Sequence, residues 1–292
     1  WGPPIIEQGR LTLAAMLRRL GYRTACIGKW HLGWTWATKD GQPAASGKDK
    51  LSNVDFKKPI ANGPTTRGFD YYFGVDLPNF PPYCYIEQDR TLGLPSVVST
   101  PEINRPGPML AGWKQVDILP EIGRRSVKYI EDTIKSSVSE PFFLYVPLTS
   151  PHYPVVPSKE FQGKSKAGDY GDFVMQTDAV VGEILRALDR NGLTENTIVI
   201  FTSDNGPEVV GEVGIGAYER IRRFGHASMG RFRGVKRDLW EGGHRVPFLI
   251  RWPNQIKANT TSDETIAHTD LMATFAAILK TPLPNDAAED SV

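Results

Sequence analysis

Chemically capable side chains follow three apolar stretches of the sequence. Lys29 and His31 come after "TACIG", His152 comes after "PFFLYVPLTS", and Asp204 and Asn205 come after "TIVIFTS". A cation offsets charge on a group that is being transferred, and a histidine can give a proton to a leaving oxygen. A lysine, two histidines and an acid–amide pair therefore suit the hydrolysis of an anionic ester.

Asp204 and Asn205 predict a metal site for a hard cation. Both side chains supply oxygen ligands, which Ca²⁺ and Mg²⁺ prefer and zinc does not. Gly206 and Pro207 follow directly and form a turn that could aim both side chains at one ion. Two adjacent residues cannot complete a coordination shell, so we expect at least one further carboxylate from elsewhere.

Each of these residues also has a purely structural interpretation. Lys29 alone is more often a solvated cation at a strand end, and His31 or His152 alone is more often a hydrogen-bonded structural histidine. The "SDNG" segment alone is a good turn. The combination of residues, and no single one of them, favours an active site.

The surrounding sequence predicts helices alternating with apolar strands. Helical stripes occur in residues 11–20, 122–134, 174–191 and 269–280, and strands are expected at 24–28, 141–149, 197–203 and 246–252. This alternation is typical of an α/β fold with a mostly parallel central sheet and helices on both faces. Residues 34–118 show weak periodicity and many Pro, Gly and Asn residues. We expect them to form a long, loop-rich excursion over the sheet that carries specificity.

In such a fold, ligands bind beyond the carboxyl ends of the parallel strands. We therefore expect the polar residues after the strands to gather on one edge of the sheet. Lys29 and His31 are two residues apart, so an extended backbone would point both to one side and Trp30 to the other.

Composition excludes several other classes of protein. The chain has 292 residues and a net charge of +1, which gives no basic stripe for nucleic acid. It has no apolar run of about 20 residues that could span a membrane, and its start lacks the form of a signal peptide. The chain begins with Trp1, and we expect it to be cut at its N-terminus.

Four blocks of the sequence, in order, resemble the sulfatase family. They are "GYRTACIGKWHLG", "SPHYP", "FTSDNGPE" and "FRGVKRDLWEGGHRVPFLIRWP". The resemblance implies an alkaline-phosphatase-like fold and the hydrolysis of sulfuric esters. It also implies that Lys29 holds the nucleophile and sulfate, His31 assists the nucleophile's proton loss and His152 is the general acid. Lys236 binds sulfate, and Asp204 and Asn205 ligate Ca²⁺, with Mg²⁺ less favoured.

The sequence also departs from the family pattern. The family's nucleophile is a formylglycine made from a Cys/Ser-x-Pro-x-Arg motif, and neither Cys26 nor Cys84 nor any serine fits it. The family's paired N-terminal aspartates are also absent. We therefore predict one partial catalytic domain over 1–292, without its first strand unit and C-terminal subdomain, that is inactive alone. Its nucleophile is expected upstream, made by a formylglycine-generating enzyme or an equivalent maturase.

Alternative functions remain open at this stage. A phospho- or phosphonate-ester hydrolase of the same superfamily would use the same residue types. A non-catalytic descendant that binds sulfated glycans would keep the anion pocket without the nucleophile. The resemblance implies a sulfated small molecule or glycan as substrate and a periplasmic, secreted or lysosomal location.

Overall fold

The computed structural model describes residues 2–47, 50–100, 105–136, 140–209 and 216–291. Trp1, on which the expected N-terminal cut depends, lies outside these ranges. The chain divides into two compact units, which are described separately. One comprises residues 1–114, 132–148 and 261–292, and the other comprises 115–131 and 149–260. The assignment of a single domain stays a prediction.

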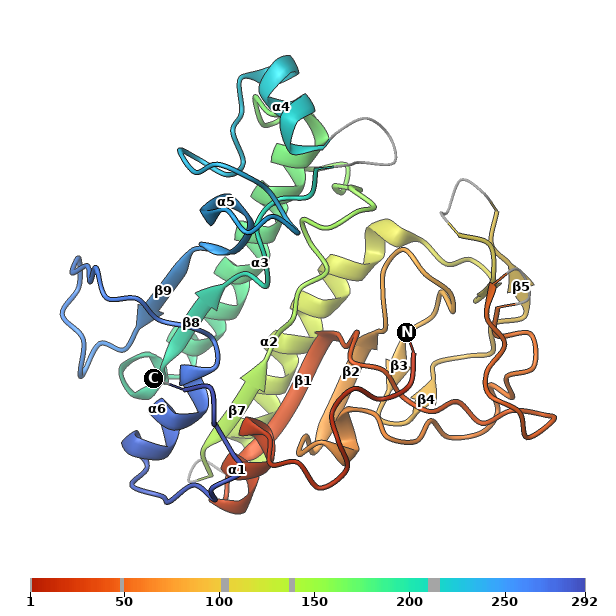
Figure 1. The fold of residues 1–292 in the computed structure, drawn as a ribbon, viewed down its shortest axis with the longest axis horizontal. Coiled ribbons are helices and arrows are strands. Elements are labelled where there is room, and N and C mark those ends of the chain that lie inside the picture. The colour runs from red at the N-terminus through yellow and green to blue at the C-terminus, as the bar shows by residue number, and fades with distance from the viewer. Residues whose placement is uncertain (1, 48–49, 101–104, 137–139, 210–215, 292) are drawn as a thin grey trace. The chain divides into compact units, whose positions relative to one another are not determined.

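The first unit contains the central sheet. Its helices and strands are α1 (Leu13–Arg19), β1 (Arg23–Lys29), a 3₁₀ helix (Pro64–Thr66), β2 (Tyr71–Val75), β3 (Ile86–Glu87), β4 (Arg90–Thr91), β5 (Val97–Val98), β6 (Pro108–Met109), β7 (Phe142–Tyr145) and α6 (Asp270–Ile278). Five strands form one sheet in the order β4-β3-β2-β1-β7 (Figure 1). Strand β5 pairs with β6. β1 is parallel to β2 and β7, whereas β2–β3 and β3–β4 are antiparallel.

The second unit is mostly helical. Its elements are a 3₁₀ helix (Gln115–Asp117), most of α2 (Ile118–Ser136), α3 (Gly168–Arg190), a 3₁₀ helix (Thr194–Asn196), β8 (Val199–Thr202), α4 (Ala217–Phe224), α5 (Glu241–His244) and β9 (Phe248–Arg251). β8 and β9 pair antiparallel, in the register Val199 to Arg251. No helix in the described part of the chain is long and apolar enough to cross a membrane.

The α/β class and the expected helices and strands are confirmed, with two differences. The central sheet is mixed, and β8 and β9 form a separate antiparallel pair within the described residues. In addition, β2 lies inside the 34–118 excursion, which was expected to be loop-rich. Apolar runs indicate that a strand is buried, but they carry no information about the direction of its partner.

Strand β1 forms the core of the first unit. Its residues Ala25, Cys26 and Ile27 are fully buried, as expected for a strand covered on both faces. Helix α1 is capped by Thr12, whose Oγ1 accepts the backbone N–H of Ala15 at 3.0 Å. The buried face of α1 packs against α6, so the two ends of the chain's sequence share one apolar cluster.

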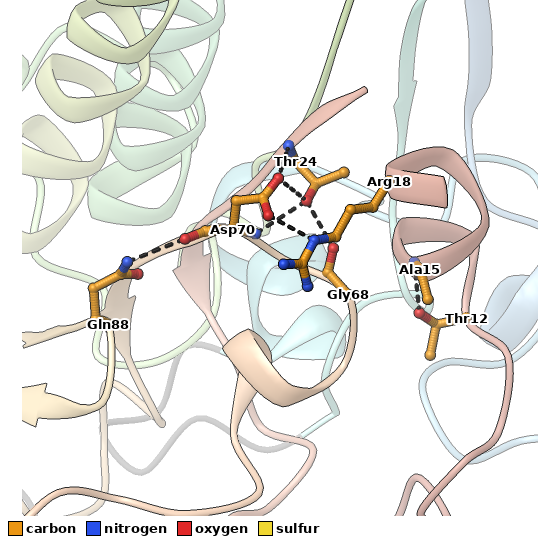
Figure 2. A network of polar contacts seen from close by, with 7 residues as sticks. All are labelled: Thr12, Ala15, Arg18, Thr24, Gly68, Asp70 and Gln88. Atoms are coloured by element: carbon orange, nitrogen blue, oxygen red, sulfur yellow. Dashed lines mark hydrogen bonds and ion pairs between the residues drawn. The ribbon is translucent and has the colours of Figure 1, made fainter. Parts of the chain in front are cut away.

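A polar network at the start of β1 joins it to the segment before β2 (Figure 2). The Asp70 carboxylate accepts the backbone N–H of Thr24 at 3.0 Å and pairs with Arg18 at 2.7 Å. The Thr24 hydroxyl donates to Gly68 O at 2.7 Å and accepts the Asp70 backbone N–H at 3.0 Å. Gln88 donates to Asp70 O at 3.0 Å. The network thereby connects the start of β1 to the segment that leads into the neighbouring strand β2.

Asp70→Ala is expected to lower the free energy of unfolding by about 1–3 kcal/mol, because it leaves the buried Thr24 N–H without its acceptor. Arg18→Ala removes only the solvent-exposed ion pair and is expected to cost less than about 1 kcal/mol. Urea denaturation of both variants tests this ranking. An equal or larger loss for Arg18→Ala would contradict it.

Candidate active site

The end of β1 places Lys29 beside β2 and β7. Lys29 is in register with Val75 of β2, and its backbone N–H donates to Pro147 O at 2.7 Å. Trp30 turns into the core, where it is 5% exposed and its indole N–H donates to Gly33 O at 2.8 Å. The Trp30 anchor therefore fixes the chain directly after Lys29.

His31 is exposed and departs from the extended geometry expected for it. The strand ends at Lys29, and His31 has a φ of 54°, in the left-handed region. Its side-chain direction therefore cannot be inferred from strand alternation. Non-glycine residues with positive φ are uncommon, although histidine tolerates this region better than most. Such backbone conformations cluster at functional sites.

Asp76 is a buried acid beside this turn that the sequence analysis missed. It directly follows β2 and is 3% exposed. Burial raises the pKa of its carboxyl, while a hydrogen bond from the His31 backbone and the charge of Lys29 act in the opposite direction. Asp76 therefore supports the turn that carries Lys29 and His31. The signal available in the sequence was a polar residue after the aromatic run "YYFGV".

In the second unit, His152 lies on a loop held by α3. The Thr177 and Ser150 hydroxyls are hydrogen-bonded at 2.7 Å, and the Ser158 backbone N–H donates to the Gln176 amide oxygen at 2.8 Å. His152 Nδ1 lies 2.5 Å from Tyr153 O. Because a carbonyl can only accept, Nδ1 carries the proton of this hydrogen bond. Nε2 is therefore the ring nitrogen that can exchange a proton with a ligand.

Asp204, Asn205 and Lys236 come from two loops that lie against each other. The backbone N–H of Lys236 donates to Pro207 O at 2.9 Å, and that of Gly206 donates to Gly243 O at 2.8 Å. These two bonds attach the turn after β8 to the loop before β9. The second unit thus joins the loops that carry these three residues, whereas the gathering of all the predicted site residues at one edge stays a prediction.

Glycine is required at position 206 because the two backbones touch there. A Cβ atom on Gly206 would lie 1.9 Å from Gly242 O, far inside van der Waals contact. The Arg237–Glu208 ion pair, at 2.6 Å, adds a third link between the loops and raises the pKa of Arg237. The "DNGP" segment is thus more than a solvent-exposed turn.

The oxygen donors of Asp204 and Asn205 fit a calcium ion. Asn205 uses its amide nitrogen to donate to Gly206 O at 2.9 Å, so its amide oxygen is the atom left to act as a ligand. Within the described ranges, no three His, Cys, Asp or Glu residues cluster as a complete metal site. These two residues alone could therefore supply only part of a coordination shell.

Neither cysteine is suited to act as a nucleophile. Cys26 and Cys84 are both unpaired and buried. Burial raises the pKa of the Cys26 thiol far above its usual range and raises that of Cys84 to about 12. The reactive thiolate form is therefore suppressed at both positions.

The predicted site residues divide between the two units. Lys29 and His31 belong to the first unit, and His152, Asp204, Asn205 and Lys236 belong to the second. Their common location on one edge of a sheet stays a prediction.

A family comparison covers almost the whole chain. The sequence model of the family described as Sulfatase matches residues 3–281. The chain belongs to the sulfatase family. All six predicted site residues lie within the matched region.

Curated sulfatases align over nearly all of this chain. It is 35% identical to N-acetylgalactosamine-6-O-sulfatase of Bacteroides thetaiotaomicron over 98% of its own length and 60% of that protein. It is 32% identical to human arylsulfatase A, covering 97% of this chain and 50% of that enzyme. The chain thus spans between half and two thirds of these sulfatases.

Solved structures support the same family and fold. One, from work on glycosaminoglycan metabolism by Bacteroides thetaiotaomicron, has a TM-score of 0.82 and 33% identity, covering 100% of this chain and 64% of that one. The PsFucS1 sulfatase from Pseudoalteromonas sp. has a TM-score of 0.71 at 22% identity, covering 99% and 56%. The chain therefore has the alkaline-phosphatase-like fold of these sulfatases.

Proposed function

We propose that the protein hydrolyses a sulfate ester of a glycan. The observation that carries this proposal is the joining of the Asp204–Asn205 turn to the Lys236 loop, by backbone hydrogen bonds of 2.8 and 2.9 Å. This arrangement combines oxygen ligands for a cation with a lysine for an anion. The named relatives include an N-acetylgalactosamine-6-O-sulfatase, which favours a sulfated amino sugar as the substrate class.

Lysine and histidine roles follow from their chemistry and the family resemblance. Lys29 is proposed to hold the sulfate oxygens and the nucleophile, with His31 assisting the nucleophile's proton loss. Lys236 is proposed to bind the sulfate. Negative charge on the sulfuryl oxygens is stabilised best by cations already fixed in place. The Trp30 anchor beside Lys29 and the two backbone bonds at Gly206 and Lys236 provide such rigidity.

His152 is proposed as the general acid. With Nδ1–H donating to Tyr153 O, the imidazolium would deliver its second proton from Nε2 to the leaving alcohol oxygen. The S–O bond to the alcohol would then break as the O–H bond forms and as sulfur bonds to the proposed nucleophile, so that the alcohol leaves uncharged.

Asp204 and Asn205 are proposed to bind Ca²⁺. When bound, the ion would supply charge stabilisation to the sulfate oxygens. The acid–amide pair would hold the ion at the end of β8, on the turn that is bonded to the Lys236 loop.

The nucleophile is proposed to be a formylglycine outside these 292 residues, because no Cys/Ser-x-Pro-x-Arg motif occurs among them. The chain alone is accordingly proposed to be inactive, and a formylglycine-generating enzyme or equivalent maturase is its proposed partner. By resemblance, we further propose an extracytoplasmic location.

Hydrolysis of 4-nitrophenyl sulfate, compared with 4-nitrophenyl phosphate, tests the reaction class. The protein should be expressed as its gene encodes it, together with a formylglycine-generating enzyme. We expect a clear preference for the sulfate. A preference for the phosphate would support the phosphohydrolase alternative, and binding of sulfated glycan without turnover would support the non-catalytic one.

Substitution of His152 tests its role through the leaving group. His152→Ala is expected to lower kcat about 10²–10⁴-fold for a sugar sulfate, whose alcohol needs a proton to leave. The loss for 4-nitrophenyl sulfate should be far smaller, because nitrophenolate leaves without protonation. His226→Ala, in the same unit, is the control and should affect both substrates alike. Equal losses for both substrates with His152→Ala would contradict the assignment.

A further inference from the structure

The turn that carries Lys236 has an unusual backbone conformation. The backbone N–H of Asp238 donates to Val235 O at 2.9 Å, so residues 235–238 form a β-turn with Lys236 and Arg237 at its centre. Of these four residues, Arg237 alone has a positive φ, of 77°. This is the pattern of a type II turn, whose third position usually holds glycine or asparagine. Arginine is strained there, because its Cβ atom disfavours the left-handed region.

Hydrogen bonds hold the first half of this turn. The Asp238 side chain accepts the backbone N–H of Val235 through Oδ2 at 3.0 Å. The backbone N–H of Lys236 donates to Pro207 O at 2.9 Å, on the segment that follows the proposed calcium ligands. None of these hydrogen bonds involves a group of Arg237 itself. The strained residue is held instead through its side chain.

Glu208 is a fixed acceptor for that side chain. Arg237 Nη1 lies 2.6 Å from Glu208 Oε1. The same oxygen accepts the backbone N–H of Val209 at 2.8 Å. The carbonyl of Glu208 accepts the backbone N–H of the buried Ala217, at the start of α4, at 2.9 Å. Glu208 is therefore held in place, and it ties Arg237 to the residue directly after Pro207.

The ion pair contributes little to the stability of the whole fold. The Arg237 side chain is 65% exposed, and an exposed pair changes an equilibrium constant by about fivefold at most. This effect is nevertheless similar in size to the cost of placing a non-glycine residue in the left-handed region. The pair can therefore decide whether the turn keeps its conformation, while the rest of the fold is unaffected.

We propose that Arg237 is a positioning residue, whose ion pair with Glu208 keeps Lys236 in place to bind the sulfate. This inference rests on the proposed function, in which Lys236 binds the sulfate and Asp204 and Asn205 bind the calcium ion. If the turn relaxes, the Lys236 backbone moves relative to the Asp204–Asn205 turn. A lysine that must be ordered again when the sulfate binds loses part of its contribution to affinity.

Arg237→Gly separates positioning from overall stability. Glycine adopts a positive φ without strain, so relief of the strain should offset the lost ion pair and leave the urea midpoint unchanged. In the protein expressed as its gene encodes it, KM for 4-nitrophenyl sulfate is expected to rise about threefold to fivefold, while kcat stays within about twofold. Asn259→Gly, at an exposed residue of the same unit with a φ of 59°, is the matched control and should change neither constant.

Substitution of the acceptor tests whether the ion pair carries the effect. Glu208→Gln is expected to raise KM by the same factor as Arg237→Gly. The double variant should show no larger rise than either single variant, because each substitution removes the same interaction. Arg237→Lys keeps a cation near Glu208 and should show a smaller rise. Effects of the two single substitutions that multiply in the double variant would overturn the proposal.

Hydrogen–deuterium exchange separates this inference from the proposed function, because it needs neither substrate nor turnover. The Lys236 amide, which is bonded to Pro207 O, is expected to exchange faster in Arg237→Gly than in the wild type, at an unchanged urea midpoint. Faster exchange supports the positioning of Lys236 by the ion pair even if no sulfate ester is cleaved. Unchanged exchange in the folded variant, or faster exchange with an unchanged KM, would contradict the proposed role.

Discussion

Lys29→Met is expected to lower kcat/KM for a sulfate ester by about 10²–10³-fold, the typical loss when one fixed group that stabilises the transition state is removed. Methionine keeps an apolar stem of similar length and removes the charge. The loss should be large because the backbone holds Lys29 in place, through its bond to Pro147 O at 2.7 Å and the buried Trp30 that follows it.

Measurement of kcat/KM for Lys29→Met, alongside unfolding of the same variant, tests this prediction. Lys39→Met, an exposed lysine of the same unit, is the matched control and should retain activity. Lys29→Arg should restore little of the lost activity, because a planar guanidinium does not replace a compact ammonium. A loss below tenfold for a folded Lys29→Met variant would remove Lys29 from the proposed mechanism.

Gly74→Ala is expected to destabilise the protein by about 3 kcal/mol or more, at the upper end of overpacking costs. A Cβ atom at Gly74 would lie 1.7 Å from Gly28 O, the carbonyl of its register partner on β1. That neighbour is backbone, so it cannot rotate away as a side chain would. β1 also cannot shift freely, because it is paired with β7 on its other edge.

Urea denaturation and soluble yield measure this effect. Gly63→Ala is the matched control, since Gly63 has a φ of −86° and a Cβ there would meet only the Trp34 ring at 3.7 Å. It should be neutral or stabilising by a few tenths of a kcal/mol, because alanine lowers the entropy of the unfolded chain. A Gly74→Ala protein as stable as the Gly63→Ala protein would show that the two strands can separate without cost.

The close contact at Gly74 also explains why β2 was missed in the sequence. Its segment, "YYFGV", is aromatic and apolar, but glycine weakens the strand pattern. The same glycine allows β2 to approach β1 closely, and this approach puts Asp76 beside the Lys29 turn. At position 74, strand propensity therefore disfavours glycine, whereas the close packing of β2 against β1 requires it.

Some residues of the candidate site and of the excursion were predictable from the sequence, and others were not. Asp204 and Asn205 were predicted from the polar residues after a strand and Lys236 from the family resemblance, and the structure joins the loops that carry them. Lys50 and Arg105 lie in regions without periodicity or a motif. Their contact with Phe80 joins residues far apart in sequence, which no local pattern predicts.

The sequence alone determined the family, the α/β class, the main helices and strands, and the candidate residues at strand ends. These features depend on local patterns. The spacing of apolar residues follows from which face of a helix or strand is buried, and a polar residue directly after a strand lies at the edge of the sheet. The tertiary structure decided the pairing of β2 with β1, the antiparallel direction of β8 and β9, the left-handed backbone of His31 and the contacts of Lys50 and Arg105 with Phe80. These depend on contacts between distant segments, whose geometry is set by packing.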